Sequence, residues 1–242
     1  MLWLDIRYAW RMLLRDWRSG GLRILDFALV LAVSSVAAGG FFVDRVQKGM
    51  DQQAADLLAA DLVVSSSLPV TTEILAAAER FHLTWAKTMA FRSVVMTDAA
   101  PQLVEVKAVS RAYPLRGELR IAAAANAGEH SVGSGPEPGE VWIESRLLPL
   151  LGVVVGDELM LGSARFKISQ ILVYEPDRGG DMFSIAPRVL MQEEDVPATR
   201  LIQQGALANY HVLLAGEDAG KVIKAFRSGF EQRALDGLGG LT

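Results

Sequence analysis

Two acidic residues, Glu175 and Asp177, flank Pro176 and form the pair in this sequence best suited to acid–base chemistry. Two neighbouring carboxyl groups can act as general acid and general base when their environments separate their pKa values. Charged residues beside a proline at the end of a predicted strand are more typical of a solvated turn. We therefore interpret the pair as part of a turn. Catalysis stays the alternative, and it requires the fold to gather both carboxyl groups and a histidine in a cleft.

Other candidates for chemistry are weaker. His82, His130 and His211 lie far apart, and none has a partner at metal-ligand spacing. The absence of cysteine excludes disulfides, thiolate metal sites and cysteine nucleophiles. The segment from Gly216 to Val222 approaches a phosphate-binding loop, but it has too few residues between its glycines and lacks the magnesium-binding hydroxyl. The sequence predicts no catalytic, cofactor-binding or metal-binding residue, and no enzyme.

The net charge indicates whether the chain is suited to bind nucleic acid. The 242 residues include 24 lysines and arginines against 28 aspartates and glutamates, a net charge of -4. A nucleic-acid-binding domain needs a basic face, which this balance does not favour. We expect no nucleic acid partner, and the length suits one or two domains.

One predicted element of the chain is an apolar run near its N-terminus. Residues 24–43 read ILDFALVLAVSSVAAGGFFV, between Arg23 and Asp44. Twenty helical residues rise about 30 Å, the thickness of the hydrocarbon core of a bilayer. Asp26 lies in the first turn, where its carboxylate reaches the headgroups. The run predicts a transmembrane helix at 24–43, and a signal peptide cleaved after residues 36–38 is the alternative.

The preceding flank, residues 1–23, predicts topology and a second helix. Positive charge beside a first membrane helix stays in the cytoplasm, so we expect residues 44–242 outside. The arginines recur at helical spacing opposite an apolar sector that contains three tryptophans, which predicts an amphipathic helix in the membrane interface. A buried helix of a soluble domain is the alternative. This flank contains two aspartates and five arginines, which are Arg7, Arg11, Arg15, Arg18 and Arg23.

Small residues follow one face of the predicted transmembrane helix at Ala28, Ala32, Ser35 and Gly39. Such residues let helices approach closely in lipid. A lone anchor does not need such a face, so the pattern favours packing against partner helices.

Beyond the membrane, the pattern predicts a helical stalk at 44–60 and an α+β domain at 61–242. Residues 122–140 are rich in alanine, glycine and proline, which is typical of a loop and of a join between two subdomains. Thr71 and Thr72 predict a capped helix start. Strands are predicted at 62–65, 84–97, 103–109 and 141–143 and as a hairpin across 158–173, with helices at 73–81, 144–151 and 221–235.

Five stretches carry a family resemblance: RDWRSGGLRIL, DRVQKGMDQQAADLLAADLVVSSSLPV, PQLVEVKAVSRAYPLRGEL, GEVWIESRLLPLLGVVVGDELMLGSARFKISQILVYEPD and FSIAPRVLM. Their order and spacing resemble the N-terminal portion of the MacB/FtsX-type permeases of ABC transporters, with its periplasmic core domain, most closely the YbbP-like branch. The family-motif positions, expected to be structural, are Asp61, Pro69, Lys107, Pro114, Gly117, Arg146, Gly156, Asp157, Glu175, Pro176, Asp177, Pro187 and Arg188.

The resemblance implies a permease subunit of a bacterial inner membrane that handles a hydrophobic or lipid-like substrate. ATP would be bound by a separate cytoplasmic ABC ATPase subunit, so no cofactor is expected in this chain. The implied partners are that ATPase, further transmembrane helices of the same permease, membrane lipid and a periplasmic protein. The stalk would carry ATPase-driven motion to the periplasmic domain.

The sequence departs from the family in one respect, because it has no second apolar run near eighteen residues, whereas family members carry several more. We therefore expect the chain to be the opening fragment of a permease. The alternative is a complete single-pass membrane protein with a periplasmic sensor or assembly domain. Further membrane helices downstream would distinguish the two.

Overall fold

The computed structural model describes residues 21–97, 101–178, 186–203 and 207–216. The chain divides into two compact units, residues 1–52 and 53–242. The predicted interfacial helix of residues 1–23 lies almost wholly outside the described residues. The same is true of the predicted helix at 221–235.

One long helix, α2 (Gly21–Leu58), accounts for the described part of the first unit and ends within the second. From Arg23 to Leu58 it is long and apolar enough to cross a membrane. It contains no proline, and a continuous helix satisfies its own backbone hydrogen bonds, as a segment in lipid must. The prediction of helix through 24–43 and on into 44–60 is confirmed as far as Leu58.

The described part of the second unit is built on one ten-stranded sheet, ordered β1-β10-β2-β3-β9-β6-β8-β4-β5, with β7 paired to β2 and β8. Most neighbours are antiparallel, but β3 pairs with β9 and β6 with β8 in parallel. The strands are β1 (Leu62–Ser66), β2 (Thr84–Met96), β3 (Pro101–Val109), β4 (Leu119–Ala122), β5 (His130–Val132), β6 (Glu140–Glu144), β7 (Glu158–Leu161), β8 (Ala164–Tyr174), β9 (Arg188–Gln192) and β10 (Asn209–Ala215).

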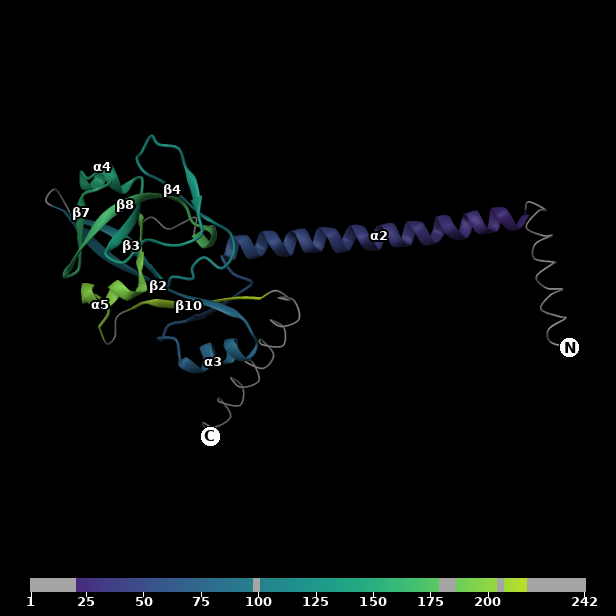
Figure 1. Cartoon of the computed structure of the whole chain (residues 1–242), viewed down its shortest axis with the longest axis horizontal. Coiled ribbons are helices and arrows are strands. Elements are labelled where there is room, and N and C mark those ends of the chain that lie inside the picture. The colour runs from purple at the N-terminus through teal and green to yellow at the C-terminus, as the bar shows by residue number, and fades with distance from the viewer. Residues whose placement is uncertain (1–20, 98–100, 179–185, 204–206, 217–242) are drawn as a thin grey trace. The chain divides into compact units, whose positions relative to one another are not determined.

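Short helices complete this unit. They are α3 (Thr72–Arg80), α4 (Leu147–Leu151), α5 (Val196–Thr199), η1 (Pro176–Arg178) and η2 (Glu193–Asp195). Helix α3 covers β1 and β10 through a small apolar cluster that includes Ile74, Leu75 and Val212 (Figure 1). The mixture of helices and strands confirms the predicted mixed composition, whereas the division into two subdomains stays a prediction.

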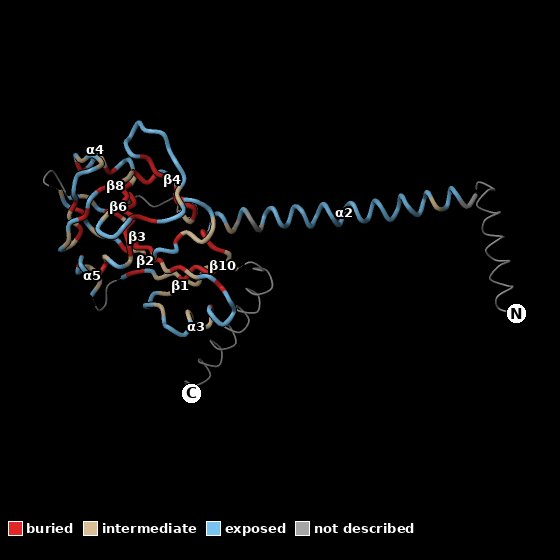
Figure 2. The backbone as a smooth tube through the Cα atoms, viewed as in Figure 1, coloured by how far each residue is buried: buried red, intermediate tan, exposed pale blue. Residues whose placement is uncertain are grey.

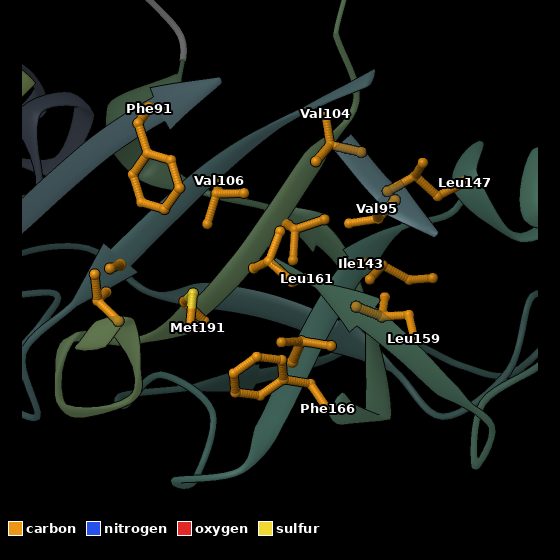
Figure 3. Packing of buried hydrophobic residues seen from close by; sticks show 14 of the residues in the cluster. Phe91, Val95, Val104, Val106, Ile143, Leu147, Leu159, Leu161, Phe166 and Met191 are labelled. Carbon is orange, nitrogen blue, oxygen red and sulfur yellow. The ribbon is translucent and has the colours of Figure 1, made fainter. Parts of the chain in front are cut away.

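Alternation along the central strands divides the apolar side chains between the two faces of the sheet. Val104, Val106 and Ala108 of β3 share one face with Val189 and Met191 of β9, and this face carries the main core (Figure 3). Figure 2 shows the buried residues gathered on the central strands.

The opposite face carries a second apolar cluster, in which large side chains surround the end of α2. Ala59 and Ala60 are fully buried there, with Tyr113, Trp142 and Leu190. This second face also holds charged side chains.

Several local predictions are confirmed and others need correction. The hairpin of β7 and β8 turns at Gly162, whose φ of +60° lies in the region that glycine adopts without strain. Residues 122–140 are not loop throughout, because β5 pairs with β4. Thr71 is the N-cap of α3, but its side chain makes no capping hydrogen bond. Helix α4 begins at Leu147, three residues later than predicted.

Candidate functional site

A cluster of charged side chains lies buried on the second face of the sheet. Lys107 and Arg188 are 4% and 5% exposed, and Glu175 is 3% exposed. Charged residues are rarely buried to this extent unless they are paired. We call Lys107, Tyr113, Glu175, Asp177 and Arg188 the buried charge cluster.

Strand register explains how two of these residues, Lys107 and Arg188, come to lie on one face of the sheet. In the parallel pair of β3 and β9, Glu105 lies opposite Arg188 and Lys107 opposite Leu190. Because side chains alternate along a strand, Glu105, Lys107 and Arg188 point to the same face. Glu175 and Asp177 follow β8 at η1, and Tyr113 enters from the segment after β3.

Lys107 is the centre of the buried charge cluster. Its Nζ lies 2.5 Å from Glu175 Oε1, 2.6 Å from Asp177 Oδ2 and 2.9 Å from the Tyr113 hydroxyl. The Tyr113 hydroxyl lies 2.5 Å from Asp177 Oδ1, to which it donates. On the other side, Arg188 Nε lies 3.2 Å from Glu175 Oε2. One carboxylate thus joins two cations inside the domain.

These contacts decide the ionisation of Glu175. Burial alone raises the pKa of a carboxyl group, but the charges of Lys107 and Arg188 outweigh burial and lower the pKa of Glu175 to about 2. Burial, with the charges of Glu175 and Asp177, raises the pKa of Tyr113 well above its ordinary value. Glu175 is therefore ionised at neutral pH, and Tyr113 is a neutral hydrogen-bond donor.

A second group of charges continues from the cluster. Glu144 Oε2 lies 2.8 Å from Arg178 Nη1 and accepts a hydrogen bond from the backbone N–H of Arg188 at 3.0 Å. Arg146 Nε lies 2.8 Å from Glu144 Oε1. Burial raises the pKa of Glu144, but the Arg188 N–H and the charges of Arg178 and Arg146 lower it overall.

The arrangement suits structure better than chemistry. An ammonium group has three protons and no lone pair, and Lys107 Nζ lies within 2.9 Å of four oxygens, which belong to Tyr113, Glu175 and Asp177. Within the described residues, no group of three or more histidine, cysteine or acidic side chains could hold a metal ion. The cluster therefore has the geometry of a cross-link between β3, β9, η1 and the segment that carries Tyr113.

That segment also contacts the end of α2. The backbone N–H groups of Leu115 and Arg116 both donate to the carbonyl oxygen of Ala59, at 3.0 Å. The Arg116 guanidinium forms a two-pronged pair with Asp61, at 2.8 and 3.1 Å. Asp61 Oδ2 also accepts the N–H of Gly216 at 3.0 Å. Residues 110–117, which we call the strap, thus join the end of α2 to the sheet.

Two of the motif residues shape the strap. The Tyr113–Pro114 peptide bond is cis. Gly117 has a φ of +70°, and a side chain there would lie 3.0 Å from the Asp56 carbonyl oxygen and 3.3 Å from Pro176. Gly117 therefore allows the strap to lie close to both α2 and η1.

The structure brings together eight of the thirteen motif positions predicted from the sequence. Asp61 contacts the strap, Pro114 and Gly117 lie in it, Pro176 lies against it, and the remaining four belong to the buried charge cluster. The eight are Asp61, Lys107, Pro114, Gly117, Glu175, Pro176, Asp177 and Arg188.

The other five positions lie elsewhere. Pro69 is exposed after β1, and the Pro187 carbonyl accepts the Glu105 N–H at 2.9 Å. Arg146 belongs to the neighbouring Glu144 group. Gly156 and Asp157 form the turn before β7, where the Asp157 carboxylate accepts the N–H of Val154 at 2.9 Å.

One interpretation from the sequence changes. A solvated turn is wrong for Glu175, because its side chain is 0% exposed between Lys107 and Arg188. The histidines stay apart, and His211 Nδ1 lies 2.9 Å from Ser65 Oγ in the β1–β10 pair. Burial, together with the charge of Lys107, lowers the pKa of His211.

Sequence reasoning missed Tyr113, Arg116 and Glu144. The run Tyr-Pro-Leu-Arg-Gly was recognised as part of a family stretch, but its side-chain roles depend on α2 and η1, which are distant in sequence. The ion pair between Asp61 and Arg116 cannot be predicted from the residues next to either of them.

The small residues of the predicted packing face, Ala28, Ala32, Ser35 and Gly39, lie in α2 and are exposed. An added side-chain atom at Gly39 would meet nothing within 4 Å. These four residues are therefore exposed with respect to the part of the chain that the structure describes.

Comparison with known proteins decides the family. No family model matches the chain. Over 212 residues, 88% of its length, the chain is 34% identical to a protein of Escherichia coli (strain K12) described as an uncharacterized ABC transporter permease, YbbP. The chain and this permease belong to one family. The chain spans about a quarter of the length of that relative.

Membership in an ABC transporter permease family agrees with an apolar helix of spanning length. Together they indicate a membrane protein. The eight clustered motif positions lie where the end of α2, the strap and η1 meet.

Proposed function

We propose that this chain acts as part of an ABC transporter permease, with α2 as a membrane-spanning helix that carries a folded domain outside the membrane. The observation that carries the proposal is the 34% identity over 88% of the chain to an ABC transporter permease. The long apolar helix supports it, because a permease must span the bilayer.

We further propose that the permease is of the MacB/FtsX type and lies in a bacterial inner membrane. Its N-terminus is cytoplasmic, and residues 44–242 are periplasmic. The arginine-rich flank of residues 1–23 supports this orientation, because positive charge beside a first membrane helix is retained inside.

The partners follow from the same proposal. A separate cytoplasmic ABC ATPase subunit binds ATP, and this chain holds no cofactor of its own. Further transmembrane helices pack on the face of Ala28, Ala32, Ser35 and Gly39, whose exposure supports such packing. Lipid surrounds α2, and the outer domain is available to a periplasmic partner.

In this proposal the chain passes ATPase-driven motion to the outer domain for a hydrophobic or lipid-like substrate. The continuous helix from Gly21 to Leu58 supports it, because an unbroken helix is stiff enough to transmit displacement. The outer domain has no active site in this reading, which the saturated hydrogen bonding of Lys107 supports.

The test is association with an ATPase. The full gene product that contains this sequence would be co-expressed with ABC ATPase subunits of the same organism and purified in nanodiscs. We expect a subunit to co-purify and its ATP hydrolysis to change at least severalfold in the complex. A permease preparation that binds no ATPase would contradict the proposal and favour a single-pass sensor or assembly protein.

A further inference from the structure

The strap, residues 110–117, makes an outer contact with the end of α2 and an inner contact with the buried charge cluster. The outer contact is the Asp61–Arg116 pair at 2.8 Å, with the two N–H groups that donate to Ala59. The inner contact is the Tyr113 hydroxyl between Lys107 and Asp177. All of these residues belong to the second compact unit.

The two contacts differ in exposure. The Arg116 side chain is 38% exposed and that of Asp61 is 11% exposed, so water screens this pair. Exposed ion pairs change a folding equilibrium by about fivefold at most. The Tyr113 side chain is fully buried among charged partners, and losing one hydrogen bond to such a group shifts an equilibrium by at least roughly tenfold.

The backbone at the end of α2 is left-handed at one residue. Ala59 has a φ of +56°, a conformation that disfavours a residue with a side chain by roughly tenfold. Ala59 and Ala60 are buried, but each contributes only one methyl group to the apolar cluster. Opening of the Asp61–Arg116 pair restores water to the two charged groups.

We propose that the strap is a two-stage fastening, in which the outer contact at Asp61 opens while the inner contact at Tyr113 stays closed. The end of α2 then detaches from the strap without disturbing β3 or β9. The role of this opening in transport rests on the proposed function, in which movement of α2 reaches the outer domain. The fastening itself is a property of this chain and does not depend on an ATPase.

Hydrogen–deuterium exchange of the complete chain in nanodiscs tests the proposal. The outer contact is removed by Arg116→Gln, and the inner hydroxyl by Tyr113→Phe, which keeps the ring. The control is Arg111→Gln, the same change in the strap at a fully exposed pair with Glu194 at 3.2 Å. Peptides that cover residues 55–62 and 101–109 report the end of α2 and β3.

We expect Arg116→Gln to raise exchange of residues 59–62 by about two- to fivefold and to leave β3 unchanged. Tyr113→Phe should raise exchange in β3 as well, by at least about tenfold. Arg111→Gln should change neither peptide. Any other pattern overturns the proposal, in particular an equal rise in both peptides with Arg116→Gln or no rise at residues 59–62. Because no ATPase is present, this result is independent of whether the chain serves a transporter.

Discussion

At the scale of single residues, the unusual feature of this domain is a carboxylate with no exposed atoms between two cations. Glu175 meets Lys107 at 2.5 Å and Arg188 at 3.2 Å. Removing charges from water is costly, and a buried pair offsets that cost only while every member is present. The cluster therefore makes the domain sensitive to loss of one partner, although a fully apolar replacement of the whole cluster could be neutral.

Replacing Lys107 by methionine should lower the free energy of unfolding by about 3–5 kcal/mol, because Glu175 and Asp177 lose their shared cation. Chemical denaturation of the chain in detergent, followed by tryptophan fluorescence, measures the change. The matched control is Lys87→Met, which breaks a 2.5 Å pair with Glu193 whose side chains are about one-third exposed. That change should cost under about 1 kcal/mol. Equal losses in the two variants would contradict a stabilising role for the cluster.

The lowered pKa of Glu175 also predicts how the free energy of unfolding depends on pH. Its pKa in the folded domain is about 2, below its ordinary value of 4.5, so the unfolded chain binds a proton more readily. The stabilisation from Glu175 is complete above pH 4.5 and is lost as pH falls from 4.5 towards 2. Denaturation midpoints measured across this window should fall less steeply for Glu175→Gln. The control Glu158→Gln, at an exposed pair with Arg165, should keep the slope of the unmodified chain.

At the scale of elements, α2 and the sheet obey different rules. The helix buries no apolar face in the described structure, and Phe27 and Phe41 are each more than 70% exposed. Such exposure suits lipid or partner helices and does not suit water. The sheet instead buries both faces, one in the main core and one around the end of α2.

The small-residue face of α2 carries a prediction at this scale. Ala32→Leu should weaken association of the helices in the permease, because a larger side chain holds the backbones apart. Ala37→Leu is the control, since the helical period puts Ala37 on the opposite side. Crosslinking or co-purification of the assembled permease measures association. An intact assembly with Ala32→Leu would argue against a packing role for this face, and equal disruption by Ala37→Leu would argue against its specificity.

At the scale of the whole molecule, the chain contains an apolar helix long enough to span a membrane and a folded domain, and it belongs to the family of an ABC transporter permease. The clustered motif positions lie where the end of α2, the strap and η1 meet. Within the proposed transporter, this junction is the place where movement of the helix enters the outer domain. The co-purification experiment tests the transporter, and the exchange experiment tests the junction.

The sequence alone determined features whose physical cause is local. A predominantly apolar run of twenty residues without proline predicts a spanning helix wherever it occurs. The period of the following residues predicted that the helix continues to residue 60, and it ends at Leu58. Alternation predicted the long strands, and Gly162 predicted the β7–β8 turn, because only neighbouring residues decide the backbone there. The family resemblance also came from the sequence, through ordered stretches.

Only the tertiary structure decided which charged residues are buried. Glu175 and Lys107 are 68 positions apart in the chain. The residues around Pro176 therefore do not indicate that a lysine side chain lies beside Glu175 in the fold. Asp61 and Arg116 are 55 positions apart, and their contact depends on how the strap crosses the end of α2. The parallel pairing of β3 with β9 places Arg188 beside Glu105. Burial and pairing are properties of the assembled sheet, because each requires surfaces that local sequence does not contain.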